Sequence, residues 1–122
     1  MKVICFRGKG KTRKTTILTR VLNEYFNIKI HEGKKDFIIT FPYKDYLVGI
    51  CSAGDSLGHV KKGIKIFESQ RCRKVICSCR SRGKGLKYLK DKFGTDVSFI
   101  EKEGEYFGES EYQEFIRKFN SV

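Results

Sequence analysis

The chain has no apolar run that approaches the roughly 18 residues needed to cross a bilayer. Its start also lacks the apolar stretch between a basic segment and a small-residue cleavage site that marks a secretory signal. The cysteines number five, and an odd count does not make a complete disulfide framework. From these absences we expect a protein of the reducing cytoplasm with no membrane partner.

Internal repeats, low-complexity segments and linkers are also missing. The hydrophobic fraction of 39% and the aromatic fraction of 13% are spread along the sequence, whereas a disordered chain of this charge would have few Phe and Tyr residues. A length of 122 residues is enough to bury one hydrophobic core and too short for two. We therefore expect residues 1–122 to form a single domain.

Several kinds of active site find no support in the sequence. We find no Ser/His/Asp arrangement typical of a hydrolase and no carboxylate pair typical of a glycosidase. The two histidines, His31 and His59, are predicted to lie at the surface. Cys72, Cys77 and Cys79 are spaced C-x4-C-x-C without a clear fourth metal ligand nearby, so we interpret them as small buried hydrophobic residues.

Acidic residues are scarce until the C-terminal segment. Residues 1–35 contain ten Lys and Arg against two Glu, residues 36–100 contain thirteen against six acids, and residues 101–122 contain three against six. Most of the chain would then present a positive field that attracts nucleotides, nucleic acid or an acidic protein. The alternative is that the lysines only keep a small domain in solution. One loop contains a cluster of five basic residues, Arg7, Lys9, Lys11, Arg13 and Lys14. Like charges so close together repel one another, and a bound anion would offset this repulsion.

That cluster belongs to the most informative stretch, residues 3–16, with the sequence VICFRGKGKTRKTT. An apolar run is followed by two glycines, then by Lys-Thr-Thr and a segment with helical periodicity, which is the layout of a phosphate-binding loop. The pattern G-x-x-x-x-G-K-[ST] fits residues 8–15 at seven of eight positions, four of which are unrestricted, and Arg13 stands where the second glycine belongs. The alternative is a basic loop that no longer binds nucleotide.

The roles within this loop follow from the chemistry of phosphate binding. Gly8 and Gly10 would let backbone N–H groups turn toward a phosphate at the start of a helix, for which Thr12 is a candidate N-cap. Lys14 would contact the β- and γ-phosphates, and the hydroxyl of Thr15 would bind Mg²⁺.

Strands alternate with helices along the rest of the chain. We predict strands at residues 2–6, 28–31, 37–41, 46–51, 74–79 and 97–100, helices at residues 13–26, 57–70, 86–93 and 110–119, and a turn at residues 42–45. The alternation indicates an α/β fold in which a doubly wound, mostly parallel sheet forms the middle of three layers. The short connection between residues 37–41 and 46–51 predicts an antiparallel hairpin at one edge.

Two further polar loops follow predicted strands, at residues 52–56 and 80–85. Ligands of open α/β sheets bind beyond the carboxyl ends of the strands, so these loops should meet the loop of residues 8–15. Asp55 is a candidate Mg²⁺ ligand, directly or through water, with Ser52 as a competitor. The alternative is that Ser52, Asp55 and Ser56 cap the following helix.

Two arginines of the second loop are further candidates. Arg80 and Arg82 could hold phosphate oxygens bidentately, and Gly83 and Gly85 would allow that loop to close over a ligand. The alternative is a solvated basic turn.

With these residues in place, the chain resembles the P-loop NTPase superfamily, in particular small single-domain ATP-binding members met in bacterial and phage genomes. The resemblance rests on VICFRGKGKTRKTT, on ICSAGDS and on VICSCRSRGKG. It implies a nucleoside triphosphate, ATP or GTP, bound with Mg²⁺, in a protein that is a weak NTPase or a small kinase. The metal ligands would be Thr15 and Asp55. The implied binding residues are Gly8, Lys9, Gly10, Lys11, Thr12, Arg13, Lys14, Thr15, Thr16, Asp55, Arg80 and Arg82.

The second hypothesis is a non-enzymatic domain with a degenerate P-loop. Its basic face would bind nucleic acid or an acidic protein partner, with Tyr43 and Tyr46 as candidates for base stacking or for packing. This hypothesis predicts that two sets of basic residues form one continuous surface. The first set is Arg7, Lys9, Lys11 and Arg13, and the second is Lys61, Lys62, Lys65, Arg71, Arg73 and Lys74.

Overall fold

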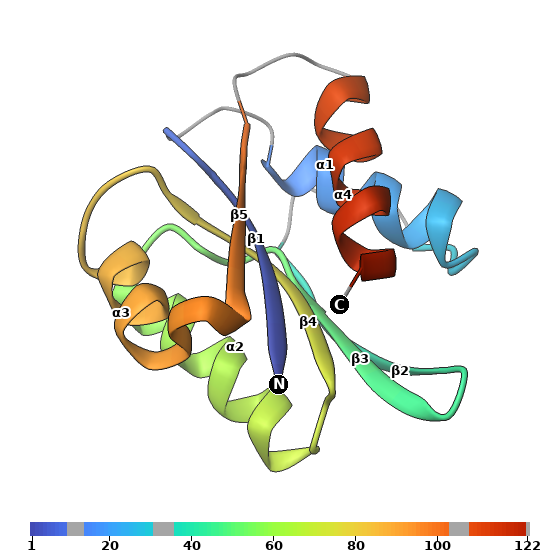
Figure 1. Ribbon diagram of the computed structural model, residues 1–122, viewed down its shortest axis with the longest axis horizontal. Helices are drawn as coiled ribbons and strands as arrows, with labels where there is room; N and C mark the ends of the chain where they lie inside the picture. The colour runs from blue at the N-terminus through green and yellow to red at the C-terminus, as the bar shows by residue number, and fades with distance from the viewer. Residues whose placement is uncertain (10–13, 31–35, 103–107, 122) are drawn as a thin grey trace.

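Five strands form one mixed sheet, and four α-helices accompany it within the described part of the chain (Figure 1). The computed structural model describes residues 1–9, 14–30, 36–102 and 108–121. The elements in chain order are β1 Lys2–Gly8, α1 Lys14–Arg20, the π-helical turn η1 Val21–Tyr25, β2 Ile38–Tyr43, β3 Tyr46–Cys51, α2 Leu57–Ser69, β4 Lys74–Arg80, α3 Lys84–Phe93, the 3₁₀ turn η2 Gly94–Asp96, β5 Val97–Glu101 and α4 Glu109–Ser121. The prediction of an α/β fold is confirmed.

The strand order is β2-β3-β4-β1-β5. Strands β3, β4, β1 and β5 are parallel, and β2 pairs antiparallel with β3 at the edge, as the hairpin prediction required. The β1–β4 register runs from Lys2 opposite Lys74 to Gly8 opposite Arg80. The carboxyl ends of β3, β4 and β1 are therefore neighbours at one edge of the sheet, and the loops that follow them meet there.

Helices cover both faces of the sheet (Figure 1). Side chains of β1 alternate between the two faces, as the period of two in a strand dictates. Ile4 and Phe6 join a core with residues of α1 and α4, including Leu18 and Phe115. On the other face, Val3 and Cys5 pack with residues of α2 and α3, including Phe67 and Leu89. Because β1 is apolar on both faces, it occupies the interior of the sheet.

The hairpin turn is shorter than predicted. Pro42 and Tyr43 belong to β2, where they pair with Leu47 and Tyr46, so the prediction of a turn over residues 42–45 was wrong at its first two positions. Only two residues connect the strands, and Lys44 adopts a φ of 54°, which two-residue hairpins favour. A proline is tolerated in β2 because an edge strand can leave one side of its backbone unpaired.

The strand predicted for residues 28–31 does not form over its described part, residues 28–30. The backbone N–H of Ile28 donates to the carbonyl of Leu22 at 2.9 Å, and that of Ile30 donates to Oδ1 of Asn23 at 3.2 Å. These donors are satisfied by the preceding turn, which takes the place of a sheet partner. The same region departs from the predicted long helix, because α1 passes into η1 at Val21. His31 and the candidate N-cap Thr12 lie outside the described residues.

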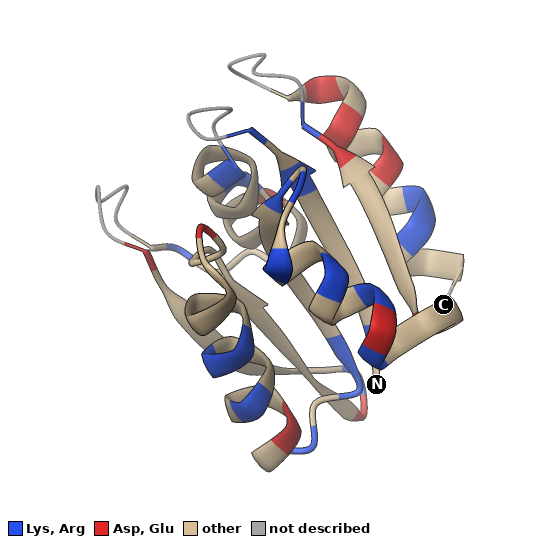
Figure 2. Cartoon of the chain, turned by 90° about the vertical axis from the view of Figure 1, so that its left-hand side faces the viewer, with Lys and Arg blue, Asp and Glu red and all other residues tan. Residues whose placement is uncertain are grey.

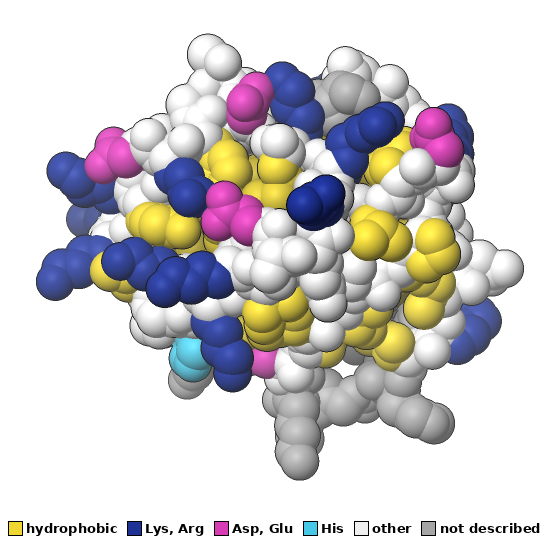
Figure 3. All heavy atoms as spheres, turned by 90° about the horizontal axis from the view of Figure 1, so that it is seen from below, with side chains coloured by type: hydrophobic (Ala, Val, Ile, Leu, Met, Phe, Trp, Pro, Cys, Tyr) yellow, Lys and Arg dark blue, Asp and Glu magenta, His cyan; other side chains and the backbone are white. Residues whose placement is uncertain are grey.

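The surface at the amino ends of the strands shows hydrophobic side chains in separate patches between Lys and Arg residues (Figure 3).

Within the described residues, none of the helices has the length and apolar character that crossing a bilayer requires. The five cysteines are buried free thiols, and for Cys72, Cys77 and Cys79 this agrees with the interpretation as small buried hydrophobic residues.

Candidate functional site

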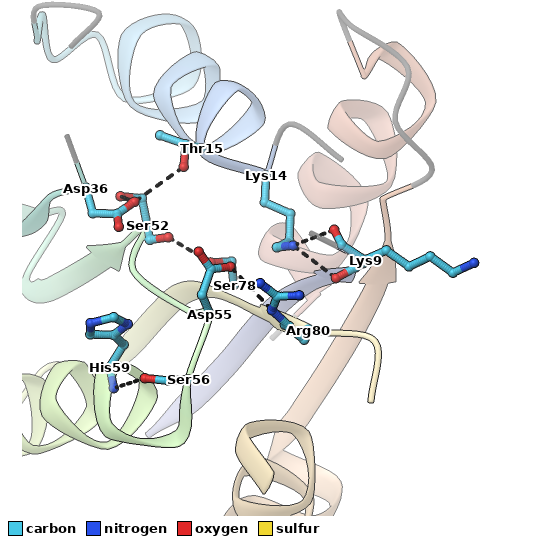
Figure 4. Close-up of polar contacts among 11 residues, drawn as sticks. Lys9, Lys14, Thr15, Asp36, Ser52, Asp55, Ser56, His59, Ser78 and Arg80 are labelled. Atoms are coloured by element: carbon cyan, nitrogen blue, oxygen red, sulfur yellow. Dashed lines mark hydrogen bonds and ion pairs between the residues drawn. The ribbon is translucent and has the colours of Figure 1, made fainter. Parts of the chain in front are cut away.

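The Lys14 side chain is the centre of the site. It begins α1 with 8% of its surface exposed, and its Nζ donates to the carbonyl oxygens of Gly8 at 2.9 Å and Lys9 at 3.0 Å (Figure 4). The backbone N–H of Ser81 also donates to the Gly8 carbonyl, at 3.1 Å. The end of β1 thus holds the ammonium group of Lys14 and the first residue after β4 together.

Charged groups from the neighbouring loops act on Lys14. Burial lowers the pKa of the Lys14 amine, the carboxylate of Asp55 acts in the opposite direction, and the guanidinium of Arg80 lowers this pKa further. Nε of Arg80 lies 3.8 Å from Oδ1 of Asp55, and both side chains are about half exposed. The site therefore combines one buried cation, one exposed cation and one carboxylate, each from a different loop.

Thr15 meets a carboxylate that the sequence reasoning missed. Its hydroxyl donates to Oδ1 of Asp36 at 3.5 Å, and the hydroxyl of Ser52 donates to the same oxygen at 3.2 Å (Figure 4). Asp36 lies just before β2, and because β2 is antiparallel, its first residues lie at the carboxyl edge of β3. The predicted hairpin could have revealed this placement, since it fixes the direction of the edge strand.

Ser52 and Gly54 fix the loop between β3 and α2 against β4. The Ser52 hydroxyl is buried and accepts from the backbone N–H of Phe37 at 2.8 Å, while the Ser78 hydroxyl donates to the Ser52 carbonyl at 3.0 Å. A Cβ placed on Gly54 would lie 2.0 Å from the carbonyl oxygen of Ser78, so only glycine fits at this position. This packing holds Asp55 beside the end of β4.

Ser56, and not Asp55, caps α2. The Ser56 hydroxyl accepts from the backbone N–H of His59 at 3.2 Å (Figure 4), and His59 itself is exposed at the helix start, as predicted. The capping alternative thus applies to Ser56, while the carboxylate of Asp55 faces Arg80.

Two hollows lie over this edge of the sheet. One, of about 260 Å³, is lined by residues 54–57, by Arg80 and Arg82, and by residues 83–85. The other, of about 290 Å³, is lined by Lys9, Arg80, Ser81 and Arg82. The two arginines predicted from the sequence border both hollows, so an anion in either would meet guanidinium groups.

The structure brings Gly8, Lys9, Lys14, Asp55 and Arg80 to this edge, with Arg82 on the walls of the hollows. Thr15 faces Asp36 in place of Asp55, and Thr16 is half-buried on α1. The predicted binding residues Gly10, Lys11, Thr12 and Arg13 lie outside the described residues. Among the residues that the structure describes, no group of three His, Cys, Asp or Glu side chains is arranged to hold a metal ion.

The members of the predicted basic surface lie at different places along the sheet, and Lys61, Lys62 and Lys65 lie on α2. Arg7 lies at the carboxyl edge, where it pairs with Glu101. Arg73 and Lys74 lie at the other end of β4, and Nζ of Lys74 donates to the carbonyl of Phe119 at 3.1 Å. Arg7 is therefore separated from Arg73 and Lys74 by the length of a strand.

The two aromatic candidates, Tyr43 and Tyr46, pack against other rings. The centre of the Tyr43 ring lies 5.8 Å from the centre of the Tyr46 ring and 5.5 Å from that of the Phe119 ring. Both tyrosines border the aromatic core between the sheet and α4.

In comparisons with known proteins, no family model, no curated protein and no solved structure matches this chain.

Proposed function

We propose that this chain is a P-loop-like protein of three layers that binds the phosphates of ATP or GTP at the carboxyl edge of its sheet. The proposal depends on the position of the Lys14 ammonium group. The Lys14 side chain is buried, and the carbonyls of Gly8 and Lys9 hold its ammonium group at the end of β1. A buried cation at a strand-to-helix junction, preceded by a glycine-rich sequence, is the arrangement that phosphate-binding loops use.

The charges around Lys14 suit a polyphosphate. An ammonium group has three N–H donors, and the two carbonyls of the loop use two of them, so the third can donate to a phosphate oxygen. Arg80 and Arg82 border the adjoining hollows and can bind phosphate oxygens bidentately. A bound phosphate would also offset the repulsion between Lys14 and Arg80 that lowers the pKa of the lysine.

The oxygen atoms near Thr15 are suitable ligands for a magnesium ion. Mg²⁺ prefers oxygen ligands and keeps several of its waters. Hydroxyls of Thr15 and Ser52 and the exposed carboxylate of Asp36 supply three oxygens, and Asp36 accepts from both hydroxyls. When bound, the ion would neutralise phosphate charge. We therefore add Asp36 to Thr15 as a metal ligand and keep Asp55, which faces Arg80, as the second carboxylate, acting through water.

Phosphoryl transfer from a bound nucleotide requires few groups beyond those that bind the phosphates. Phosphoryl transfer depends mainly on positioning and on charge neutralisation, and Lys14, Arg80 and Arg82 supply cations of the right kind. We assign no catalytic base. A weak NTPase or a small kinase is thus the activity that the site supports.

The test is calorimetric titration of ATP and GTP, with Mg²⁺, into the wild type, Lys14→Ala and Lys14→Met. Methionine keeps most of the apolar stem of lysine, so it separates loss of charge from loss of packing. A charged hydrogen bond contributes about 1.5–3 kcal/mol, so both variants should bind at least about tenfold more weakly. Lys29→Met, at an exposed lysine beyond η1, is the matched control and should bind like the wild type.

Equal affinity of the Lys14 variants and the wild type would reject the site, and no heat with either nucleotide would reject the function. Asp36→Asn and Asp55→Asn then assign the metal ligand. The variant that loses the dependence of nucleotide affinity on Mg²⁺ identifies the coordinating carboxylate.

A further inference from the structure

The two helical layers differ sharply in charge. Helices α2 and α3 carry seven lysines against two acids, Glu68 and Asp91. On the other face of the sheet, α1, η1 and α4 carry four basic and four acidic residues. Figure 2 shows the basic residues along the helices nearest the viewer, and acidic residues gathered on α4 behind them. Of the two helical layers, the one formed by α2 and α3 therefore carries the net positive charge.

Much of this charge is not neutralised within the layer. Nζ of Lys92 lies 3.3 Å from Glu68, and that of Lys87 lies 3.9 Å from Asp91. Lys62, Lys65 and Lys84 are exposed and form no ion pair with another residue in the described ranges. An exposed group of cations without counter-charges raises the local concentration of anions in solution.

Helices α2 and α3 pack side by side, so their lysines share one surface. A Cβ on Gly85 would lie 3.2 Å from the Val60 side chain, and the Lys92–Glu68 pair joins the other ends of the helices. Nζ of Lys61 lies 5.5 Å from the centre of the Tyr88 ring, across the same junction. We call the exposed residues Lys61, Lys62, Lys65, Lys84, Lys87 and Lys90 the lysine layer.

The lysine layer begins next to the hollows of the candidate site. Lys84, the first residue of α3, lines the hollow of about 260 Å³ together with Arg80 and Arg82. Lysines one turn apart on a helix have Cβ atoms about 5–6 Å apart. A chain of regularly spaced anions lying across the helices could therefore contact several ammonium groups at once and lead into the arginine-bordered hollow.

We propose that the lysine layer binds the phosphodiester backbone of a nucleic acid without reading its sequence. Flexible lysines that act as point charges are suited to phosphate contacts, which fix position but carry no base information. Tyr88, the aromatic residue of α3 that faces α2, is half-buried beneath Lys61 and is not presented as a platform for bases. An acidic protein partner would need an apolar centre within the charged rim, and this layer exposes mainly lysine.

This proposal does not depend on nucleotide binding, because the carbonyls of Gly8 and Lys9 hold Lys14, and neither residue belongs to the lysine layer. The experiment uses fluorescence anisotropy of labelled oligonucleotides of about 20 nucleotides, as single-stranded DNA, duplex DNA and single-stranded RNA, titrated across a range of salt. The surface variant combines Lys62→Gln, Lys65→Gln and Lys84→Gln. The control combines Lys29→Gln, Lys44→Gln and Arg117→Gln, three exposed positions away from α2 and α3, and removes the same net charge.

Three lost phosphate contacts should weaken binding at least about tenfold in dilute salt and reduce the slope of log K against log salt by about 2 units for single strands and about 3 for duplex DNA. The control should retain most of the affinity and the wild-type slope, and Lys14→Met should bind oligonucleotides like the wild type even where it no longer binds ATP. Equal losses in the surface variant and the control would overturn the proposal. So would the lack of binding to every oligonucleotide in dilute salt, or equally tight binding to anionic lipid vesicles.

Discussion

The backbone of Gly54 packs directly on the carbonyl group of Ser78, with room for a hydrogen but not for a methyl group. Ser78 also donates from its hydroxyl to the carbonyl of Ser52 at 3.0 Å. These contacts join the loop after β3 to the last residues of β4. They place Asp55 and Arg80, which are distant in sequence, on the same edge as Lys14.

Gly54→Ala should therefore destabilise the protein by about 3 kcal/mol, because the new Cβ would lie 2.0 Å from the Ser78 oxygen and the overpacked loop must shift. Urea unfolding followed by circular dichroism measures the change. Gly58→Ala, on α2, meets only the Ser56 hydroxyl at 3.8 Å and should be neutral or stabilising by up to about 1 kcal/mol. Similar effects of the two alanines would contradict the close packing at Gly54.

Ser52→Ala should lower the free energy of unfolding by about 1–3 kcal/mol, because the N–H of Phe37 would lose its acceptor in a partly buried position. Asp36 would lose a donor in the same variant. Ser69→Ala, at an exposed hydroxyl near the end of α2, is the control and should change stability by less than about 0.5 kcal/mol. A Ser52 variant as stable as the control would show that these bonds contribute little in solution.

Arg20 should couple α1 to α4 in a manner that depends on pH. Its guanidinium pairs with Glu24 at 2.9 Å and Glu109 at 2.6 Å, and it lies 4.1 Å from the centre of the Tyr112 ring. Bonds from Gln113 and Arg20 lower the pKa of Glu109 below its ordinary value of 4.5. The stability from this shift is present above 4.5 and is lost as the pH falls through the lowered pKa.

Arg20→Gln should consequently destabilise the protein more at neutral pH than at acid pH, as measured by chemical denaturation at a series of pH values. Arg117→Gln, at an exposed position of α4, should show no such trend. A destabilisation by Arg20→Gln that is constant across the acid range would argue that the cation–π contact, and not the carboxylates, carries the effect.

The cysteines should resist modification in the native protein. All five are buried, and the Cys5 thiol donates to Sγ of Cys79 at 3.3 Å. That bond, with the charges of Lys14 and Arg7, lowers the pKa of Cys79, but its side chain has no exposed surface. Ellman's reagent at neutral pH should therefore label the native chain slowly and label five thiols after denaturation. Rapid labelling of the native protein would show that the core opens readily.

The affinity for nucleotide should fall with rising pH before an ordinary lysine would lose its proton. Burial lowers the Lys14 pKa from 10.5, so the neutral amine, which binds phosphate poorly, begins to form below that value. Calorimetric titrations at increasing alkaline pH measure this loss, which should be missing in Lys14→Met. Cys79→Ser should keep the wild-type profile, and a profile that followed Cys79 would assign the titration to the thiol.

Some of this architecture is local in origin. The apolar run at the start of the chain and the helical spacing of hydrophobic residues were enough to predict β1, α2 and α4 near their observed positions. Glycines and basic residues indicated the loops at residues 8–15 and 80–85. The alternation of strands and helices also predicted that these loops meet, because parallel strands share an edge for their carboxyl ends. Residues 28–30 have strand-like side chains and were predicted as part of a strand. Their backbone N–H groups instead donate to acceptors in the preceding turn, at Leu22 and Asn23.

What the sequence by itself determined was thus most of the elements, the α/β class and the residues at the ends of its strands, since these follow from periodicity and from turn chemistry. Only the tertiary structure decided that Thr15 meets Asp36 and not Asp55, that Gly54 packs on Ser78, and that the lysines of α2 and α3 form one layer. Those relationships join segments far apart along the chain, and strand pairing and helix packing set them.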